Sequence, residues 1–227
     1  MDDLTIIICT YNEEKTICDV VKACRLFNER CEIIVVDDGS QDNTGPLLRS
    51  LNKTIRFRYI KLPENMGKSY AMTIGIENAC NDILLFFDAD SIGIRKEHFH
   101  DILMPMLDNK ADMVLGHTAA TFMNIRLTPF KAFTGERVLR KKDIMPILDE
   151  IRNIRFGIET YINLYFQTHG KRISYVFLDG LKTLNKYKKT TLIKATGQYF
   201  REGHEIASTI IKNYDLIFKM AKSSKIR

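Results

Sequence analysis

The sequence predicts an α/β fold with a mostly parallel central sheet flanked by helices. In the 227-residue chain, strongly apolar segments at 4–9, 32–38 and 82–90 alternate with segments of helical periodicity. Strands that are apolar along their whole length are typical of a parallel sheet that is covered on both faces. In such sheets, ligands bind at the carboxyl ends of the strands. Polar residues at those ends are therefore candidate functional residues.

Each remaining element is expected from its own pattern. Helices are expected at 14–29, at 41–53 after a turn, and at 68–80 and 98–109; further strands are expected at 55–62 and 111–118. From about 119 to 157 the pattern mixes turns with a basic helix. A helix over 158–170, a strand over 171–179 and one or two amphipathic helices from about 190 complete the chain. No repeat or low-complexity linker divides it, which indicates one domain over 1–227 with halves of about 1–118 and 119–227.

Bulk composition narrows the class of protein. Hydrophobic residues make up 45% and charged residues 27% of the chain, which is ordinary for a soluble globular protein. The net charge of +6 suits an anionic partner such as a nucleotide, a phosphorylated lipid or a membrane surface. The aromatic residues do not interleave with a basic stripe, so we expect no nucleic-acid partner.

Cysteine usage and the chain ends predict a cytoplasmic protein. Five cysteines without a CxxC pair favour reduced, mostly buried thiols over a disulfide framework. The N-terminal residues are acidic where a signal peptide would be basic, and no segment has the roughly 18 apolar residues needed to span a bilayer. The segment 204–227 is amphipathic and basic. It fits peripheral contact with the inner face of a membrane, packing on the sheet, or a second subunit in a homodimer.

Acidic side chains follow two of the apolar strands, and Asp88 and Asp90 follow a third. A pair spaced in this way either holds Mg²⁺ or Mn²⁺, which take carboxylate oxygens and share them with substrate phosphates, or caps a turn. The phosphate-binding patterns GxxxxGK[ST] and GxGxxG are both absent after the first strand. This excludes a P-loop and a typical dinucleotide site.

Four motifs in register carry a family resemblance: TYNEE (10–14), VVDDGSQDNT (35–44), NMGKSYAM (65–72) and FFDADS (86–91). Together they resemble the nucleotide-sugar-binding half of glycosyltransferase family 2, whose members have a single-domain GT-A fold and include dolichol-phosphate mannose synthases. Beyond about residue 118 the resemblance is thinner. There TGER (134–137), FGIE (156–159) and VFLDGLKTLNKYKK (176–189) are similar to the acceptor half of short soluble members. The resemblance implies a metal-dependent, inverting transfer of a sugar from a nucleotide-diphosphate donor.

The same resemblance implies roles for residues of the first half. Thr10, Tyr11 and Glu13 would flank the base and the ribose. Asp38 would accept a hydrogen bond from the ring N–H of uracil or guanine, and Asp37 would shape the turn beneath it. The ordinary structural alternatives are a surface aromatic, a first-turn acid of a helix and turn residues.

The remaining nucleotide-binding residues implied by the resemblance surround the phosphates. Asn65, Gly67 and Lys68 would form a wall over the nucleotide, with Lys68 meeting phosphate charge. Asp88 and Ala89 would contact the nucleotide. Asp88 and Asp90 would hold Mg²⁺ or Mn²⁺, with Asp90 as the direct ligand. Lys68 could instead be a solvated helix residue.

In the second half, Glu159 is the candidate general base, or else only an acid at a helix N-terminus. Arg137, Arg140 and Lys141 would bind an acceptor phosphate, or form a solvated basic helix. We expect a UDP-sugar as sugar donor, with GDP-mannose second, and a glycan, a small molecule or a polyprenyl phosphate as acceptor.

Two positions depart from the family pattern. No histidine stands near Thr183, where short soluble relatives often have one, and Ile92 stands where some mannose synthases have a polar metal contact. These departures leave open a non-catalytic relative that binds nucleotide sugars.

Overall fold

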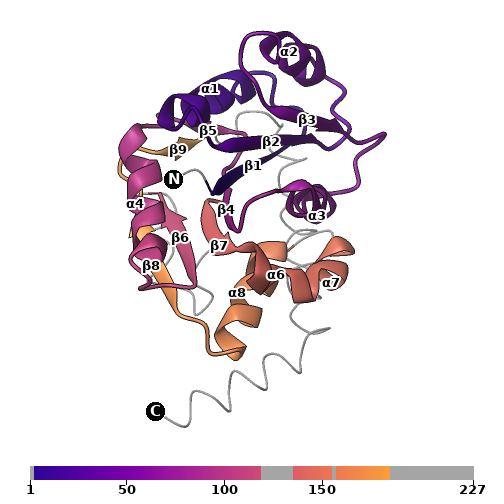
Figure 1. Cartoon of the computed structure of the whole chain (residues 1–227). Coiled ribbons are helices and arrows are strands. Elements are labelled where there is room, and N and C mark those ends of the chain that lie inside the picture. The colour runs from indigo at the N-terminus through magenta and orange to yellow at the C-terminus, as the bar shows by residue number, and fades with distance from the viewer. Residues whose placement is uncertain (1–2, 119–134, 155–156, 185–227) are drawn as a thin grey trace, which may run out of the picture.

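A seven-stranded sheet forms the centre of the molecule (Figure 1). The computed structural model describes residues 3–118, 135–154 and 157–184. The strand order is β3-β2-β1-β4-β7-β6-β8, and β7 is antiparallel to both of its neighbours while the other pairs are parallel. The strands are β1 (Leu4–Thr10), β2 (Glu32–Asp37), β3 (Arg58–Lys61), β4 (Ile83–Phe86), β6 (Met113–His117), β7 (Arg137–Arg140) and β8 (Ile173–Phe177).

Helices cover both faces of the sheet (Figure 1). They are α1 (Ile17–Phe27), α2 (Thr44–Leu51), α3 (Lys68–Asn78), α4 (Lys96–Leu107), α6 (Lys141–Ile144), the 3₁₀ helix η1 (Met145–Ile147), α7 (Leu148–Arg152) and α8 (Ile158–Thr168). Two short strands, β5 (Ser91–Ile92) and β9 (Lys182–Thr183), form a separate antiparallel pair.

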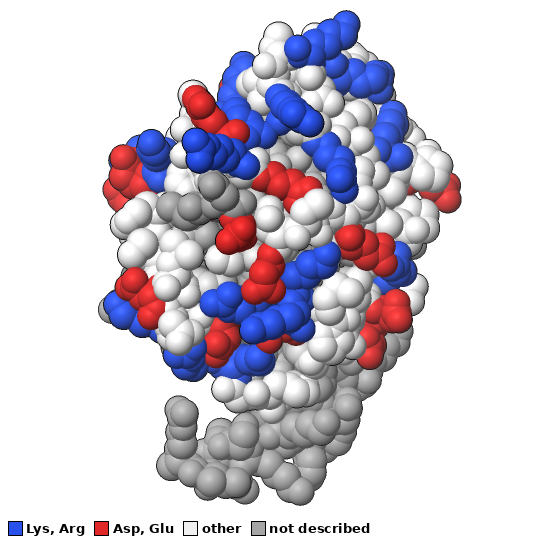
Figure 2. Space-filling model, viewed as in Figure 1, with Lys and Arg blue, Asp and Glu red and all other residues white. Residues whose placement is uncertain are grey.

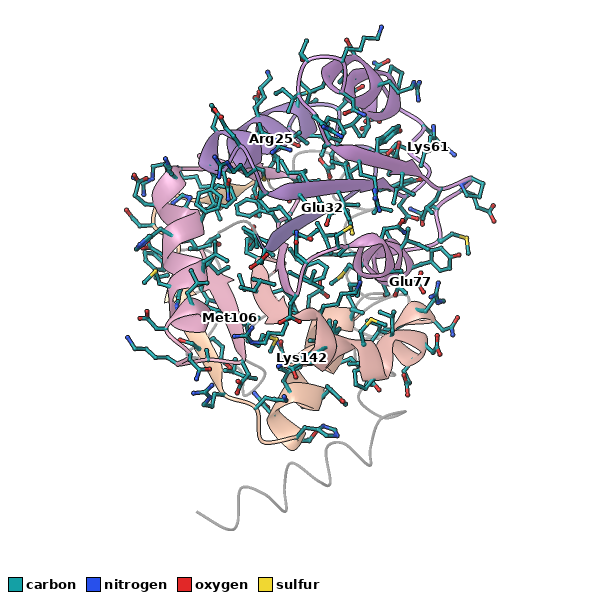
Figure 3. All side chains as sticks on the ribbon, viewed as in Figure 1. Arg25, Glu32, Lys61, Glu77, Met106 and Lys142 are labelled. Carbon is teal, nitrogen blue, oxygen red and sulfur yellow. The ribbon has the colours of Figure 1, made fainter. Side chains whose placement is uncertain are left out.

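Alternate residues of the strands feed two cores. On β1, Ile6 and Ile8 pack with α1, α2 and α4, whereas Ile7 packs with α3, α7 and α8 on the other face. An ion pair between Arg152 and Glu77 also joins α7 to α3, and Figure 3 shows Glu77 on the α3 side of that contact. Burial on both faces explains why the strands are apolar along their whole length.

The predicted α/β architecture is confirmed, with element ends shifted by a few residues. The prediction was wrong for residues 137–140, which were assigned to a region of turns and a basic helix and form strand β7 instead. Val138 and Leu139 are both fully buried. An apolar run of two residues between basic residues is too short to be recognised as a strand in the sequence. The two-residue strands β5 and β9 were also missed.

The five cysteines are free thiols, as expected; Cys24 and Cys31 are buried, whereas Cys80 is exposed. Within the described residues, no helix has both the length and the apolar character required to cross a membrane. On the face in Figure 2, acidic side chains lie between the basic ones. The predicted amphipathic helices from about residue 190 lie outside the described residues.

Candidate active site

The carboxyl ends of β1, β2 and β4 meet at one edge of the sheet, because the three strands are parallel. Thr10, the last residue of β1, pairs with Asp37 of β2, and Ile7 pairs with Phe86 near the end of β4. Antiparallel β7 begins at the same edge, where Arg137 pairs with Phe86. This edge therefore brings together motifs that are far apart in the chain: TYNEE, VVDDGSQDNT, FFDADS and the end of TGER.

Hydrogen bonds join the loops that follow β1 and β2. The backbone N–H of Asn12 donates to Ser40 Oγ at 3.0 Å, and the Asn12 side-chain oxygen accepts from the Gln41 N–H at 2.8 Å. The Glu13 N–H donates to Thr44 Oγ1 at 2.9 Å. Asn12 takes a positive φ of 55°, a conformation that asparagine tolerates better than most residues. The predicted nucleotide-binding loop is thus held at both sides.

Thr10 and Tyr11 stand at this loop in different environments. The Thr10 side chain is buried, and its hydroxyl has no hydrogen-bond partner among the described residues. Tyr11 is 40% exposed, so its ring is available for stacking. Their contacts with a base or ribose stay predictions.

Asp37 shapes the turn after β2, as predicted. Its carboxylate is fully buried and accepts hydrogen bonds from the Ser40 N–H at 2.8 Å and from the Tyr59 hydroxyl at 2.7 Å. A buried carboxylate is stable only when its oxygens are satisfied in this way. Asp37 is therefore a structural residue of the site.

Asp38 holds the NMGKS segment against the loop after β2. Its carboxylate is buried and accepts from the Met66 N–H at 2.8 Å and the Gly67 N–H at 2.9 Å. Burial raises the pKa of Asp38 above its ordinary value, although both amide bonds oppose the change. Gly67 takes φ 97°, and a Cβ on Gly39 would overlap the backbone of Glu64. The segment 65–68, predicted to form a wall over the nucleotide, is thus held next to Asp38. That Asp38 accepts a hydrogen bond from a base stays a prediction.

Four charged side chains from four separate segments gather at Lys68, the last residue of the predicted wall. Lys68 Nζ lies 3.0 Å from Asp88 Oδ1 and 2.8 Å from Glu159 Oε1. Arg137 is fully buried and close enough to interact electrostatically with both carboxylates. The group contains two cations and two anions, so it is balanced in charge.

The ionisation of this group follows from its mutual pairing. Burial opposes the charged form of Glu159, but Lys68 and Arg137 outweigh it and lower the pKa of Glu159 to about 2. Burial likewise opposes the charge on Lys68, yet Asp88 and Glu159 raise its pKa above the ordinary value. Both partners are therefore charged at neutral pH.

A small pocket lies at this group. Its charged side is lined by Lys68, Asp88, Arg137 and Glu159 together with Gly135, and its apolar side is lined by Ile7, Cys9, Met72, Phe86 and Phe87. A Cβ on Gly135 would overlap the carboxylate of Asp88. Glycine at this position lets the TGER backbone approach the aspartate closely.

Contacts on both sides fix the segment 88–91, and the roles of Leu184 and Glu136 in them were not predicted from the sequence. The Leu184 N–H donates to the Asp90 carbonyl at 2.9 Å, next to the pairing of Ser91 with Thr183. On the other side, Ser91 Oγ donates to Glu136 Oε1 at 2.9 Å, and both residues are buried. The position of Thr183 beside the aspartates agrees with its expected place in the family pattern.

Ala89, predicted to contact the nucleotide, is 5% exposed and packs in the core with α1 and α4. Its methyl group is therefore used for packing.

Two predicted acceptor residues lie elsewhere. Antiparallel pairing places Arg140 opposite Ile83, at the other end of β7 from Arg137. The two arginines are roughly 10 Å apart along the strand. Arg140 pairs with Asp82 at 3.2 Å, and Lys141 Nζ donates to the Ala79 carbonyl at 2.7 Å. The structure brings Arg137, but neither of these two, to the site.

Binding of Mg²⁺ or Mn²⁺ by Asp88 and Asp90 stays a prediction. The described residues contain no cluster of three or more His, Cys, Asp or Glu side chains that could hold a metal ion by themselves. Mg²⁺ is commonly bound through one or two carboxylates together with substrate phosphates. Two aspartates just after β4 supply the number of carboxylates that such a shared site needs.

Known proteins share this sequence and this fold. Poly-beta-1,6-N-acetyl-D-glucosamine synthase from Staphylococcus aureus (strain COL) is 37% identical over 159 residues, which are 69% of this chain and 33% of that protein. The chain thus spans about one third of the length of the curated relatives it matches. The crystal structure of glucosyl-3-phosphoglycerate synthase from Mycobacterium tuberculosis with phosphoglyceric acid has a TM-score of 0.70 at 18% identity, covering 90% of this chain and 79% of that chain.

A second structure of the mycobacterial synthase, with Mn²⁺, UDP and glucosyl-3-phosphoglycerate, has a TM-score of 0.69 at 18% identity and covers 90% of this chain and 78% of that chain. The model of the family Glycosyl transferase family 2 matches residues 5–178. With its seven-stranded sheet in the GT-A arrangement, this chain belongs to glycosyl transferase family 2.

Proposed function

We propose that this chain is a glycosyltransferase that moves a sugar from a UDP-sugar to an acceptor, with inversion, and uses Mg²⁺ or Mn²⁺. The observation that carries the proposal is the convergence of Asp38, Lys68, Asp88 and Glu159 at one sheet edge. GDP-mannose is the second candidate sugar donor, because Asp38 suits either base. The UDP complexes of the mycobacterial synthase support the first choice.

The chain's own residues would divide the work of binding the sugar donor. Tyr11 would stack on the base, and the segment held by Asp38 would cover the nucleotide. Lys68 would meet the phosphates. Asp88 and Asp90 would hold the metal, which when bound supplies a positive charge that stabilises the departing diphosphate.

On the acceptor side, Glu159 and Arg137 are the candidates. As general base, Glu159 would take the proton of an acceptor hydroxyl while the oxygen bonds to the anomeric carbon and the diphosphate leaves. A carboxylate with a pKa of about 2 is a weak base, so this role requires Lys68 to move from Glu159 to the phosphates. A phosphate acceptor is already anionic and needs no base; Arg137 would then attract it.

A thermal-shift screen of UDP- and GDP-sugars with and without Mn²⁺ tests the proposal. We expect a UDP-sugar with Mn²⁺ to raise the melting temperature, because a ligand that binds only the folded state stabilises it. Asp90→Asn should remove the Mn²⁺-dependent part of the shift. It should also lower turnover about a hundredfold or more, since a bound metal lowers the activation barrier by several kcal/mol. Asp101→Asn, at an exposed position of α4, is the matched control. Absence of any nucleotide-dependent shift would refute the proposal.

A second candidate is a relative that binds nucleotide sugars without turnover. Thr183 lies beside Ser91, so the position at which relatives often carry a histidine is next to the aspartates and lacks an imidazole. Nucleotide binding with neither transfer nor hydrolysis of the sugar donor would favour this candidate.

A further inference from the structure

Lys68 forms an ion pair with Asp88, one of the two aspartates that are predicted to bind the metal. It is the first residue of α3, and its ammonium bridges Asp88 and Glu159 at 3.0 and 2.8 Å. The two carboxylates come from the loop after β4 and from α8. The Lys68 ammonium thus pairs with both Asp88 of the predicted metal site and Glu159 of the acceptor half.

The pairing offsets the negative charge of Asp88, which would otherwise attract a divalent cation. Arg137 adds a second positive charge beside Asp88 and Glu159. Glu136, next to Arg137 in the chain, accepts a hydrogen bond from Ser91 Oγ at 2.9 Å. A divalent ion that approached Asp88 would therefore meet two cations at close range, and like charges in a partly desolvated site repel strongly.

Solvent nevertheless reaches the bridge. The side chains of Lys68 and Asp88 are 41% and 24% exposed, respectively. A nucleotide diphosphate could thus reach the ammonium, and its negative charge would offset the repulsion between the ammonium and a metal ion. Lysine suits such an exchange, because its ammonium is a compact charge on a flexible stem.

We propose that Lys68 makes metal binding at Asp88 and Asp90 conditional on the nucleotide diphosphate. Without nucleotide, Lys68 holds Asp88 and disfavours the divalent ion. With nucleotide, Lys68 turns to the phosphates and releases Asp88 to the metal, so that nucleotide and metal bind as a cooperative pair. The inference rests on the metal-dependent function proposed above.

Mn²⁺ titrations of the full chain, with free Mn²⁺ followed by electron paramagnetic resonance, test this coupling. For the unmodified protein, we expect saturating UDP to raise the Mn²⁺ affinity about tenfold or more, which is within the usual range of coupling between sites. Calorimetry with UDP should show that Mn²⁺ raises the UDP affinity by the same factor, because coupling is reciprocal. Equal Mn²⁺ affinity with and without UDP would overturn the inference, whatever the variants do.

Variants then assign the coupling to Lys68. Lys68→Met should bind Mn²⁺ alone about tenfold more tightly than the unmodified protein, and UDP should strengthen its Mn²⁺ binding less. Lys68→Arg retains the charge and should retain weak binding of Mn²⁺ alone. Lys61→Met, at an exposed position of β3, should behave like the unmodified protein.

The possible failures are distinguishable. If UDP and Mn²⁺ bind cooperatively but Lys68→Met binds Mn²⁺ alone no more tightly, the inference about Lys68 is wrong and the proposed function stands. If the unmodified protein binds no UDP under any condition, the proposed function is wrong and the inference is wrong with it.

Discussion

The ion pair of Glu159 should contribute measurably to folding stability. Its pKa is lowered from 4.5 to about 2 by Lys68 and Arg137, against the opposing effect of burial. Each pH unit corresponds to about 1.4 kcal/mol, so the folded state favours the charged form by about 3 kcal/mol. The Glu159 side chain is only 18% exposed, which limits screening by solvent. Glu159→Gln should therefore lower the free energy of unfolding at pH 7 by about that amount.

The pH dependence gives this prediction a second, sharper test. Because the pKa is lower in the folded state, the contribution is complete above about pH 4.5 and is lost as the pH falls toward 2. Urea unfolding of the unmodified protein and of Glu159→Gln should thus differ most near neutral pH and converge in acid. Glu150→Gln, at an exposed position of α7, should leave stability within about 0.5 kcal/mol at all pH values. A constant difference between pH 7 and pH 3 would refute the electrostatic explanation.

Two further substitutions test the contacts of His98 with the Asp179 carbonyl and of Gly135 with the Asp88 carboxylate. His98→Ala removes a buried imidazole whose Nε2 lies 2.8 Å from the Asp179 carbonyl and whose Nδ1 accepts from the Arg95 N–H at 3.2 Å. It should lower the unfolding free energy by about 1–3 kcal/mol, because the Arg95 N–H loses its acceptor and the Asp179 carbonyl keeps only the Arg95 side chain as a partner. Exposed His100→Ala should change stability little, and equal effects of the two substitutions in urea unfolding would contradict the assignment. Gly135→Ala places a methyl group against the carboxylate of Asp88, so calorimetry should show UDP–Mn²⁺ binding weakened by about tenfold or more, about 1.4 kcal/mol; unchanged affinity would show that Asp88 does not take part.

The sequence was most informative where polar residues follow apolar strands. Parallel pairing brings such strand ends together without further information, so the positions of Asp37, Asp38 and Asp88 could be predicted. The turn role of Asp37 was also predictable, because Asp at a strand end readily accepts from backbone N–H groups nearby. These predictions depend on local pattern and on one topological rule.

Long-range partners could not be predicted in the same way. Lys68 and Glu159 meet only because α8 packs on the same face of the sheet as α3, and no local pattern encodes that approach. Arg137 and Arg140 are three residues apart in a basic segment, and the extended strand β7 places them at its opposite ends. The antiparallel direction of β7 decides that Arg137, and not Arg140, is the one at the site. A strand with only two buried apolar residues gives too weak a periodic signal for its direction to be inferred.

The position of β7 has a consequence for the order in which the protein can fold. β7 lies between β4 and β6 in the sheet, although it follows both of them in the sequence. A chain that emerges from the ribosome N-terminus first has made β4 and β6 before the strand between them exists. Until β7 emerges, β4 and β6 each have an unpaired edge that β7 covers in the complete sheet, and such edges readily pair with other chains. Residues 1–118 alone are therefore expected to aggregate, although they carry all four nucleotide-binding motifs.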